Sequence, residues 1–155
     1  MDQDRFFSSQ TAWCPGCGNF PILETQMKVL NELGIAPEKV LLVGGIGQAA
    51  KTNQYINANG FSGLHGRALP PAVAAKMVNE ELTVIVNTGD GDSYGEGGNH
   101  FLHNIRRNVD INHFVHDNQV YGLTKGQTSP TADACGLLNK SRACNRSLPF
   151  NPLAI

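Results

Sequence analysis

Short apolar runs and amphipathic stretches alternate along most of the chain. After Asn19 and Pro21, apolar residues recur at helical spacing until Gly34, which predicts a helix capped by Asn19. Continuous apolar runs, typical of strands buried on both faces, occupy 39–43, 82–86 and 111–115. Further helices are predicted between these strands, at 71–78 and 98–106. The alternation of helix and strand predicts an α/β fold with an open parallel sheet.

The length and charge of the chain narrow the classes of partner. Its 155 residues are expected to form one domain, and 12 Lys and Arg against 13 Asp and Glu leave a formal net charge of −1. We therefore expect no nucleic-acid partner and no binding to an anionic membrane. The sequence shows neither a signal-peptide core nor the ~18 apolar residues of a membrane span, so a cytoplasmic protein is expected.

The regular pattern weakens in the last part of the chain. From Tyr121 onward Gly, Thr, Ser, Pro and Asn dominate, and residues 151–155 resemble the start of another element. We therefore expect 1–155 to be a single domain that is incomplete at its C-terminal end.

Glycine and polar residues gather where the predicted strands end. Of the 17 glycines, 11 lie between Gly44 and Gly98. Ligands of open parallel sheets bind beyond the carboxyl ends of the strands. The stretch 88–95 superficially offers a dinucleotide-binding turn, but its two carboxylates, Asp90 and Asp92, would repel a phosphate unless a cation intervened.

Mg²⁺ resolves this conflict because it prefers oxygen ligands and binds one or two protein side chains together with phosphate oxygens. The carboxylate of Asp90 and the amide oxygen of Asn118 follow neighbouring predicted strands, and the carbonyl of Val120 is a third candidate ligand. Gly91 and Gly122 would let the backbone approach the phosphates. These residues predict a magnesium and diphosphate site at this edge of the sheet.

A Gly-Asp-Gly sequence around Asp90 precedes Asn118 by 28 residues, and further motifs follow a fixed order at 44–47, 64–70, 89–92, 98–101, 106–108 and 117–131. Together these motifs resemble the beta subunits of 2-oxoacid:ferredoxin oxidoreductases. The resemblance implies the diphosphate-binding domain of thiamine-diphosphate enzymes, with Mg²⁺ on Asp90, Asn118 and Val120. It implies a second set of residues that bind the cofactor: Ile46, Gly47, Gln48, Ala49, His65, Gly91, Asp92, Gly122 and Leu123. The alternatives are that the glycines only form tight turns and that His65 is a hydrogen-bonded core histidine.

The same resemblance implies oxidative decarboxylation of a 2-oxoacid to acyl-CoA and CO₂, with coenzyme A as acceptor and electrons passed to ferredoxin. In the resembled enzymes a glutamate of the partner alpha subunit activates the cofactor, so no catalytic residue is predicted in this chain. Lys125 is a candidate for binding a substrate carboxylate or a coenzyme A phosphate, with simple solvent exposure as the alternative. A nonoxidative thiamine-diphosphate lyase or transferase subunit, or an inactive fragment, are the alternative functions.

Cys14 and Cys17 form a Cys-x-x-Cys sequence, which by itself is half a zinc site, half an iron–sulfur site or a redox pair. The resemblance implies that they are two ligands of a 4Fe-4S cluster. Gln48 stands where the resembled subunits have the third cysteine, and an amide is a poor substitute for a thiolate. The alternatives are an inert cysteine pair and a different metal. Cys135 and Cys144 are expected to be ordinary small residues.

Overall fold

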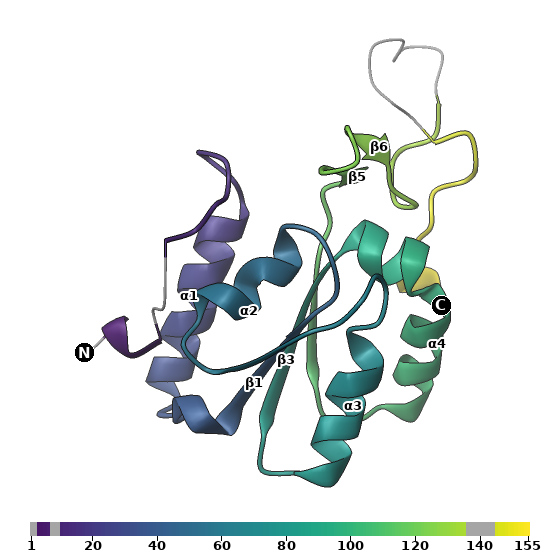
Figure 1. Cartoon of the computed structure of the whole chain (residues 1–155). Coiled ribbons are helices and arrows are strands. Elements are labelled where there is room, and N and C mark those ends of the chain that lie inside the picture. Colours follow the sequence, from purple (N-terminus) through teal and green to yellow (C-terminus); the bar gives the residue numbers. More distant parts are fainter. Residues whose placement is uncertain (1–2, 7–9, 136–144) are drawn as a thin grey trace.

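A parallel four-stranded sheet forms the centre of the molecule, in the order β2-β1-β3-β4. The computed structural model describes residues 3–6, 10–135 and 145–155 (Figure 1). The strands are β1 (Val40–Gly44), β2 (Asn59–Ser62), β3 (Thr83–Gly89) and β4 (Asn112–His116). The predicted α/β fold with an open parallel sheet is confirmed, and β1, β3 and β4 fall on the three predicted apolar runs.

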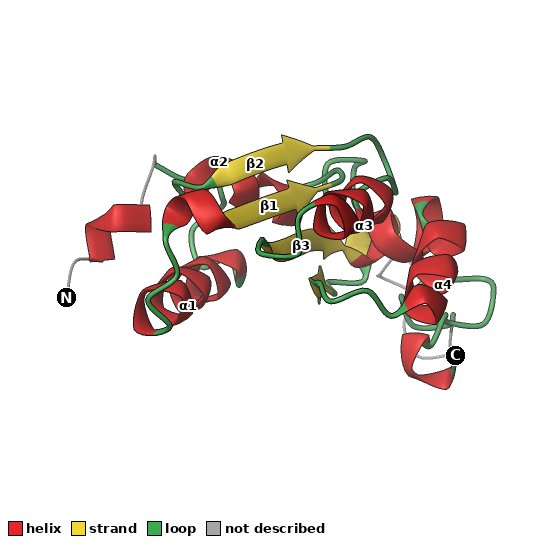
Figure 2. Ribbon diagram, turned by 90° about the horizontal axis from the view of Figure 1, so that it is seen from below, coloured by secondary structure: helices red, strands yellow, loops and turns green. Residues whose placement is uncertain are grey.

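Helices cover both faces of this sheet. The α-helices are α1 (Asn19–Glu32), α2 (Thr52–Tyr55), α3 (Leu69–Val78) and α4 (Gly98–Arg107). Figure 1 and Figure 2 show α1 on one side of the sheet and α3 and α4 on the other. Two apolar cores result. The first contains Leu23, Leu30, Leu42, Tyr55 and Ile85. The second contains Val43, Leu69, Ala72, Val84, Val86 and Phe101.

Helix α1 ends where the sequence predicts, but its predicted N-terminal cap is not observed. Gly34 follows the helix with a φ of +67°, so the chain leaves α1 in the left-handed conformation that glycine adopts without strain. The predicted cap by Asn19 is wrong, because Gly18 is the N-cap and no side chain caps the helix. The Asn19 side chain instead contacts His116, with Oδ1 lying 2.7 Å from the imidazole Nδ1.

The outer strands are more exposed than the central pair. β1 and β3 are mostly buried, as predicted. The expectation that 111–115 forms a strand buried on both faces is wrong, since β4 borders the sheet and Phe114 is 45% exposed. β2 escaped prediction because its residues, Asn59–Ser62, are all exposed and carry no apolar run.

Several short segments connect and extend these layers. Three-residue and four-residue 3₁₀ turns lie at Gln3–Phe6, Pro37–Lys39, Ala49–Lys51 and Pro152–Ala154. A π-helical turn, Gly91–Glu96, directly precedes α4. A small antiparallel hairpin pairs β5 (Val120–Tyr121) with β6 (Gln127–Thr128). None of the helices in the described parts of the chain is long and apolar enough to cross a membrane.

The last described residues fold back toward the hairpin and the π-helical turn. The Phe150 N–H donates to Pro130 O at 2.9 Å, and the Phe150 ring lies 5.1 Å from the ring of Tyr94. Cys135 is disulfide-bonded, which corrects the expectation that it is an ordinary small residue. Cys144 lies outside the described residues.

Candidate functional site

The segments that follow the four parallel strands meet at one edge of the sheet. Gly44 at the end of β1 pairs with Ser62 of β2 and with Asn87 of β3, and Gly89 of β3 pairs with His116 of β4. Because the strands are parallel, their carboxyl ends share this edge, which is where open α/β sheets bind ligands. Figure 1 shows the β5–β6 hairpin beyond the same end of the sheet. The fold therefore gathers the segments after the three predicted strands, together with the turn after β2, which the sequence did not predict as a strand.

Asp90 is held in place by two hydroxyl groups. It follows β3 directly and is only 1% exposed. Ser129 and Thr131, which lie beyond the hairpin, both donate to Asp90 Oδ2, and the distance from Thr131 Oγ1 is 2.6 Å. Thr131 Oγ1 also lies 3.0 Å from Asp117 Oδ1. These contacts fix the carboxylate orientation, as second-shell partners of metal ligands do.

Asn118 and Val120 lie in the loop that joins β4 to the hairpin. The Asn118 amide oxygen accepts a hydrogen bond from the backbone N–H of Val120 at 3.1 Å. Gln119 between them has a φ of +62°, so the loop turns sharply at this point. Asp90 is one residue beyond Gly89, and Asn118 is two residues beyond that residue's partner, His116. One carboxylate, one amide oxygen and a backbone carbonyl are hard oxygen donors, and this donor set fits Mg²⁺.

Gly91 is needed for close packing between the two loops. A Cβ at Gly91 would lie 2.4 Å from Cε1 of Tyr121, and the Tyr121 hydroxyl donates to Gly91 O at 3.2 Å. Any side chain at position 91 would displace the tyrosine ring. Gly91 therefore allows two segments to touch, and its role in binding the cofactor stays a prediction.

Asp92 is buried beside the turns that follow β1 and β2. It is 4% exposed, and its Oδ1 accepts a hydrogen bond from the backbone N–H of Gly66 at 2.6 Å. Burial raises the pKa of the Asp92 carboxyl above its ordinary value, and the N–H groups of Gly66 and Ile46 oppose this shift. The side chain of Asp92 thus faces the two turns that follow β1 and β2.

Residues 46–49 form the turn between β1 and a 3₁₀ segment. Gly47 has a φ of +91°, and no described atom lies within 4 Å of a Cβ placed there. Ile46 is 39% exposed, whereas Ala49 is 6% exposed and packs inward. This turn leaves open space at Gly47, which suits the approach of a ligand to the backbone.

His65 lies in the turn that follows β2, and it is exposed. The alternative of a core histidine is therefore wrong. Its imidazole lies close enough to Asp92 to lower the pKa of that carboxyl. His65 and the segment around Asp92 consequently occupy the same corner of the sheet edge.

The hairpin carries the remaining predicted cofactor residues. Gly122, Leu123 and Lys125 are exposed, with Leu123 69% exposed. Lys125 has a φ of +54° at the turn of the hairpin. These residues lie in the hairpin that follows Asn118, and their ligand roles stay predictions.

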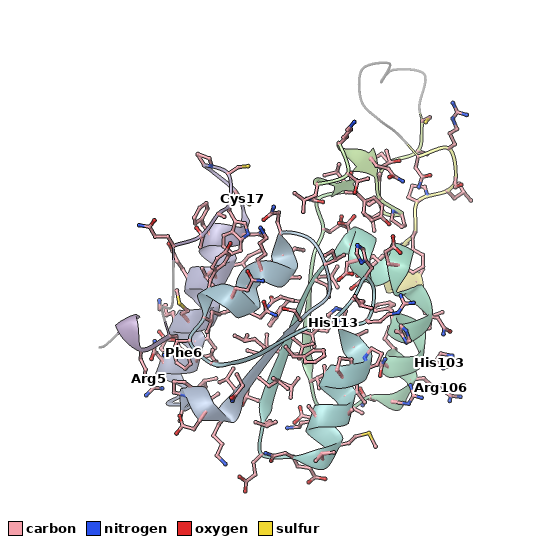
Figure 3. The ribbon with its side chains drawn as sticks, viewed as in Figure 1. Arg5, Phe6, Cys17, His103, Arg106 and His113 are labelled. Atoms are coloured by element: carbon pink, nitrogen blue, oxygen red, sulfur yellow. The ribbon has the colours of Figure 1, made fainter. Side chains whose placement is uncertain are left out.

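A buried network that the sequence did not reveal lies behind Asp90. Thr88 Oγ1 is 2.6 Å from Ser93 Oγ, and His113 Nε2 lies 2.8 Å from Thr88 Oγ1 and 3.2 Å from Ser93 Oγ. Burial lowers the pKa of His113 to about 4, so the imidazole is neutral at pH 7. Figure 3 shows His113 inside the molecule, whereas His103 and Arg106 lie on the outer side of α4.

A second polar network lies on the opposite face of the sheet. Asn87 Oδ1 accepts a hydrogen bond from Gln26 Nε2 at 2.7 Å and lies 3.1 Å from His116 Nε2. His116 also contacts Asn19 at the start of α1, and burial lowers the pKa of His116. The sequence signals that could have indicated this network are a Gln within the predicted helix and an Asn after an apolar run. Such polar side chains need hydrogen-bond partners when they are buried.

The Cys-x-x-Cys turn lies at the start of α1. Cys14 is exposed and Cys17 is half-buried, and both are free thiols (Figure 3 labels Cys17). Gln48 lies nearby, because the indole N–H of Trp13 donates to Gln48 O at 3.0 Å. The buried Gln48 Oε1 has no hydrogen-bond partner in the described part of the chain.

These residues do not fit a 4Fe-4S cluster. Among residues 3–6, 10–135 and 145–155, no group of three or more His, Cys, Asp or Glu side chains could hold a metal ion. A cluster needs four ligands, and two thiols beside an amide supply only two thiolates. The described residues by themselves therefore do not complete a cluster, and the roles of Cys14 and Cys17 as cluster ligands stay a prediction.

Comparison with known families identifies the domain. The family described as thiamine pyrophosphate enzyme, C-terminal TPP binding domain, matches residues 44–152, where TPP is thiamine diphosphate. The chain belongs to this family. The matched residues include every strand-end segment of the site in this TPP domain.

Curated relatives of the chain agree with the sequence resemblance. The chain is 50% identical over 146 residues to a 2-oxoacid:ferredoxin oxidoreductase subunit beta of Saccharolobus solfataricus, and the match covers 92% of this chain and 48% of that protein. It is 39% identical over 153 residues to the 2-oxoglutarate oxidoreductase subunit KorB of Mycobacterium tuberculosis, covering 99% of this chain and 41% of that protein. The resemblance to these beta subunits is confirmed.

A solved structure of a related enzyme has the same fold as this chain. The TPP domain matches a 2-oxoglutarate:ferredoxin oxidoreductase from Magnetococcus marinus, bound to 2-oxoglutarate, coenzyme A and succinyl-CoA, with a TM-score of 0.91 and 36% identity. The match covers 99% of this chain and 53% of that one. The chain therefore spans about half the length of the relatives it matches.

Proposed function

We propose that this TPP domain binds the diphosphate of thiamine diphosphate through Mg²⁺, as part of a 2-oxoacid:ferredoxin oxidoreductase. The proposed reaction is the oxidative decarboxylation of a 2-oxoacid to acyl-CoA and CO₂, with coenzyme A as acceptor, ferredoxin as electron acceptor and an alpha subunit as partner. Membership of the TPP-binding family and the similarity to the beta subunits support this proposal. Residues 1–155 would form its diphosphate-binding domain.

Each part of the sheet edge has a role in this proposal. Asp90, Asn118 and the carbonyl of Val120 would bind Mg²⁺, and the metal would neutralise the charge of the diphosphate. The other contacts to the cofactor would come from Ile46, Gly47, Gln48, Ala49, His65, Gly91, Gly122 and Leu123. Asp92, the remaining residue of this predicted set, would act from within the same corner of the site. Bound thiamine diphosphate supplies the carbanion chemistry of decarboxylation, and the protein supplies binding and orientation. Lys125, exposed on the hairpin, would meet an anionic group of substrate or coenzyme A.

The observation that carries the proposal is the arrangement of Asp90. A carboxylate that is 1% exposed and accepts two hydroxyl hydrogen bonds lies one residue beyond β3, beside the loop that carries Asn118. Two hydroxyl donors orient a carboxylate but leave its negative charge without a cationic partner. A bound cation at this position would balance that charge.

The test is calorimetric titration of thiamine diphosphate into the purified protein, with Mg²⁺ or with a chelator. We expect binding with Mg²⁺ and an affinity at least about tenfold weaker with chelator or in Asp90→Asn, since a neutral amide is a weaker magnesium ligand. Asp110→Asn is the matched control, because Asp110 is 91% exposed and lies before β4, at the other end of the sheet. Equal affinity with chelator, or in Asp90→Asn, would refute the metal site.

A further inference from the structure

We propose that Asp92 is a positioning residue, whose carboxylate fastens the turns after β1 and β2 onto the loop after β3 and does not itself contact the diphosphate. This inference rests on the proposed function for its effect on cofactor binding. The sequence placed Asp92 among the cofactor residues, next to Asp90, without distinguishing the roles of the two carboxylates. Their surroundings in the structure differ.

The first observation is the hydrogen bond to the turn after β2. The backbone N–H of Gly66 donates to Asp92 Oδ1 at 2.6 Å, and this contact joins residues 26 positions apart. Gly66 has a φ of +64°, which is strained for other residues, so the turn presents this N–H without a side chain in the way. A charge-assisted hydrogen bond of this kind is stronger than a neutral one.

The second observation is the close approach of the turn after β1. A Cβ at Gly45 would lie 2.1 Å from Asp92 Oδ2 and 2.8 Å from its carboxyl carbon. The carboxylate therefore lies against the backbone of Gly45, and the neighbouring Ile46 N–H lowers its pKa. Only glycine at position 45 leaves room for an acid at position 92.

The third observation is that the turn after β2 also packs directly on the π-helical segment. A Cβ at Gly66 would lie 2.3 Å from the backbone carbon of Glu96, and a Cβ at Gly97 would lie 2.8 Å from Gly66 O. Three glycine-containing segments thus meet around one buried carboxylate. Displacement of Asp92 would remove the hydrogen bond to Gly66 and the packing against Gly45 together, and both glycines belong to turns that follow the strands at the site.

The inference also explains how two neighbouring acids coexist at an anion site. Asp90 is directed toward Ser129 and Thr131, beside the Asn118 loop. Asp92 is 4% exposed and is directed toward Gly45 and Gly66, so its charge is screened from a phosphate by the backbone that surrounds it. One acid would bind the cation and the other would shape the site.

The first test compares cofactor affinity in the protein purified as it is expressed, with any subunit that accompanies it, at saturating Mg²⁺. In Asp92→Ala the affinity for thiamine diphosphate should fall at least about tenfold, because a 1 Å displacement of binding groups has effects of this size. Asp92→Asn keeps an acceptor for Gly66 N–H and should restore affinity to within about threefold of the original protein. Equal losses in both variants, or no loss in Asp92→Ala, would overturn the positioning role.

The second test measures stability without any cofactor, so it stands even if the proposed function fails. Gly45→Ala should lower the urea midpoint by about 1 M, because its Cβ would collide with Asp92. In an Asp92→Ala background the same change should cost less than half as much, since the colliding carboxylate is gone. Equal costs in the two backgrounds would show that Asp92 does not hold this turn, and the proposal would be wrong.

Discussion

The imidazole of His113 illustrates how a single buried residue fixes the loop that carries Asp90. Its Nε2 lies within hydrogen-bond distance of the hydroxyls of Thr88, in β3, and Ser93, in the π-helical turn. Burial alone lowers the pKa of His113, because it removes the imidazole from water and so disfavours the charged form. The neutral imidazole therefore connects β4 to the segment on either side of Asp90, and protonation would weaken this connection.

We predict that this histidine makes the protein less stable at mildly acidic pH. Its pKa is about 4 in the folded protein against 6.5 for the unfolded chain, so the unfolded state binds more protons between these values. The contribution is present above pH 6.5 and is lost as the pH falls toward 4. Between pH 7 and pH 5 it should reduce the free energy of unfolding by about 2 kcal/mol.

Urea unfolding of His113→Gln at both pH values checks this. Glutamine places an amide near the position of Nε2 and does not titrate, so most of the difference between pH 7 and pH 5 should disappear. The pKa of His116 is also lowered by burial, but His116 is present in both proteins and cancels in the comparison. An unchanged pH dependence in the variant would contradict the assignment to His113.

At the scale of elements, the end of α1 depends on backbone conformation more than on contacts. Gly34 has a φ of +67°, and no described atom lies within 4 Å of a Cβ placed there. We predict that Gly34→Ala lowers the free energy of unfolding by about 1 kcal/mol through left-handed strain alone. Gly34→Asn is the matched control, since Asn tolerates this conformation better and should lose roughly half as much. Equal losses measured by urea unfolding would mean that the glycine serves another purpose.

The elements that could be predicted from the sequence are those whose burial leaves an apolar pattern. β1, β3 and α1 each bury a continuous or periodic apolar face, and each was predicted near its observed position. β2 has only exposed residues, so its place in the sheet depends on pairing with β1, which no local pattern records. The burial of 111–115 was overestimated because its apolar run does not show that β4 borders the described sheet.

The site residues likewise divide into those that a local sequence pattern indicates and those that depend on distant contacts. Asp90, Asn118 and the glycine motifs were found because they follow strands, and parallel pairing brings strand ends together. Local sequence cannot show which way a buried side chain points, so it did not distinguish the orientations of Asp90 and Asp92. The contacts of His113 and His116 were also missed, because their partners lie 20 to 97 positions away in the chain.

At the scale of the whole molecule, the site is open on one side. Ile46 is 39% exposed and Leu123 is 69% exposed, although both lie on segments proposed to contact the cofactor. A groove of about 540 Å³ between α1 and β4 is also lined mainly by apolar side chains, among them Ile22, Val29, Leu33 and Phe114. Cofactor sites normally bury most of the ligand surface. In the proposed function, the exposed faces of Ile46 and Leu123 would therefore be covered by the bound cofactor or by a partner subunit.

We predict that the 155-residue chain alone turns over no 2-oxoacid, even if it binds thiamine diphosphate. In the proposed function its own residues at the sheet edge would bind and orient a diphosphate, and the acid that activates the cofactor is expected from a partner alpha subunit. Dye reduction that depends on a 2-oxoacid and coenzyme A should therefore appear only when the partner subunit is added. Release of CO₂ without dye reduction in that mixture would instead favour a nonoxidative lyase. Dye reduction by the single chain would show that the TPP domain already contains a complete catalytic site.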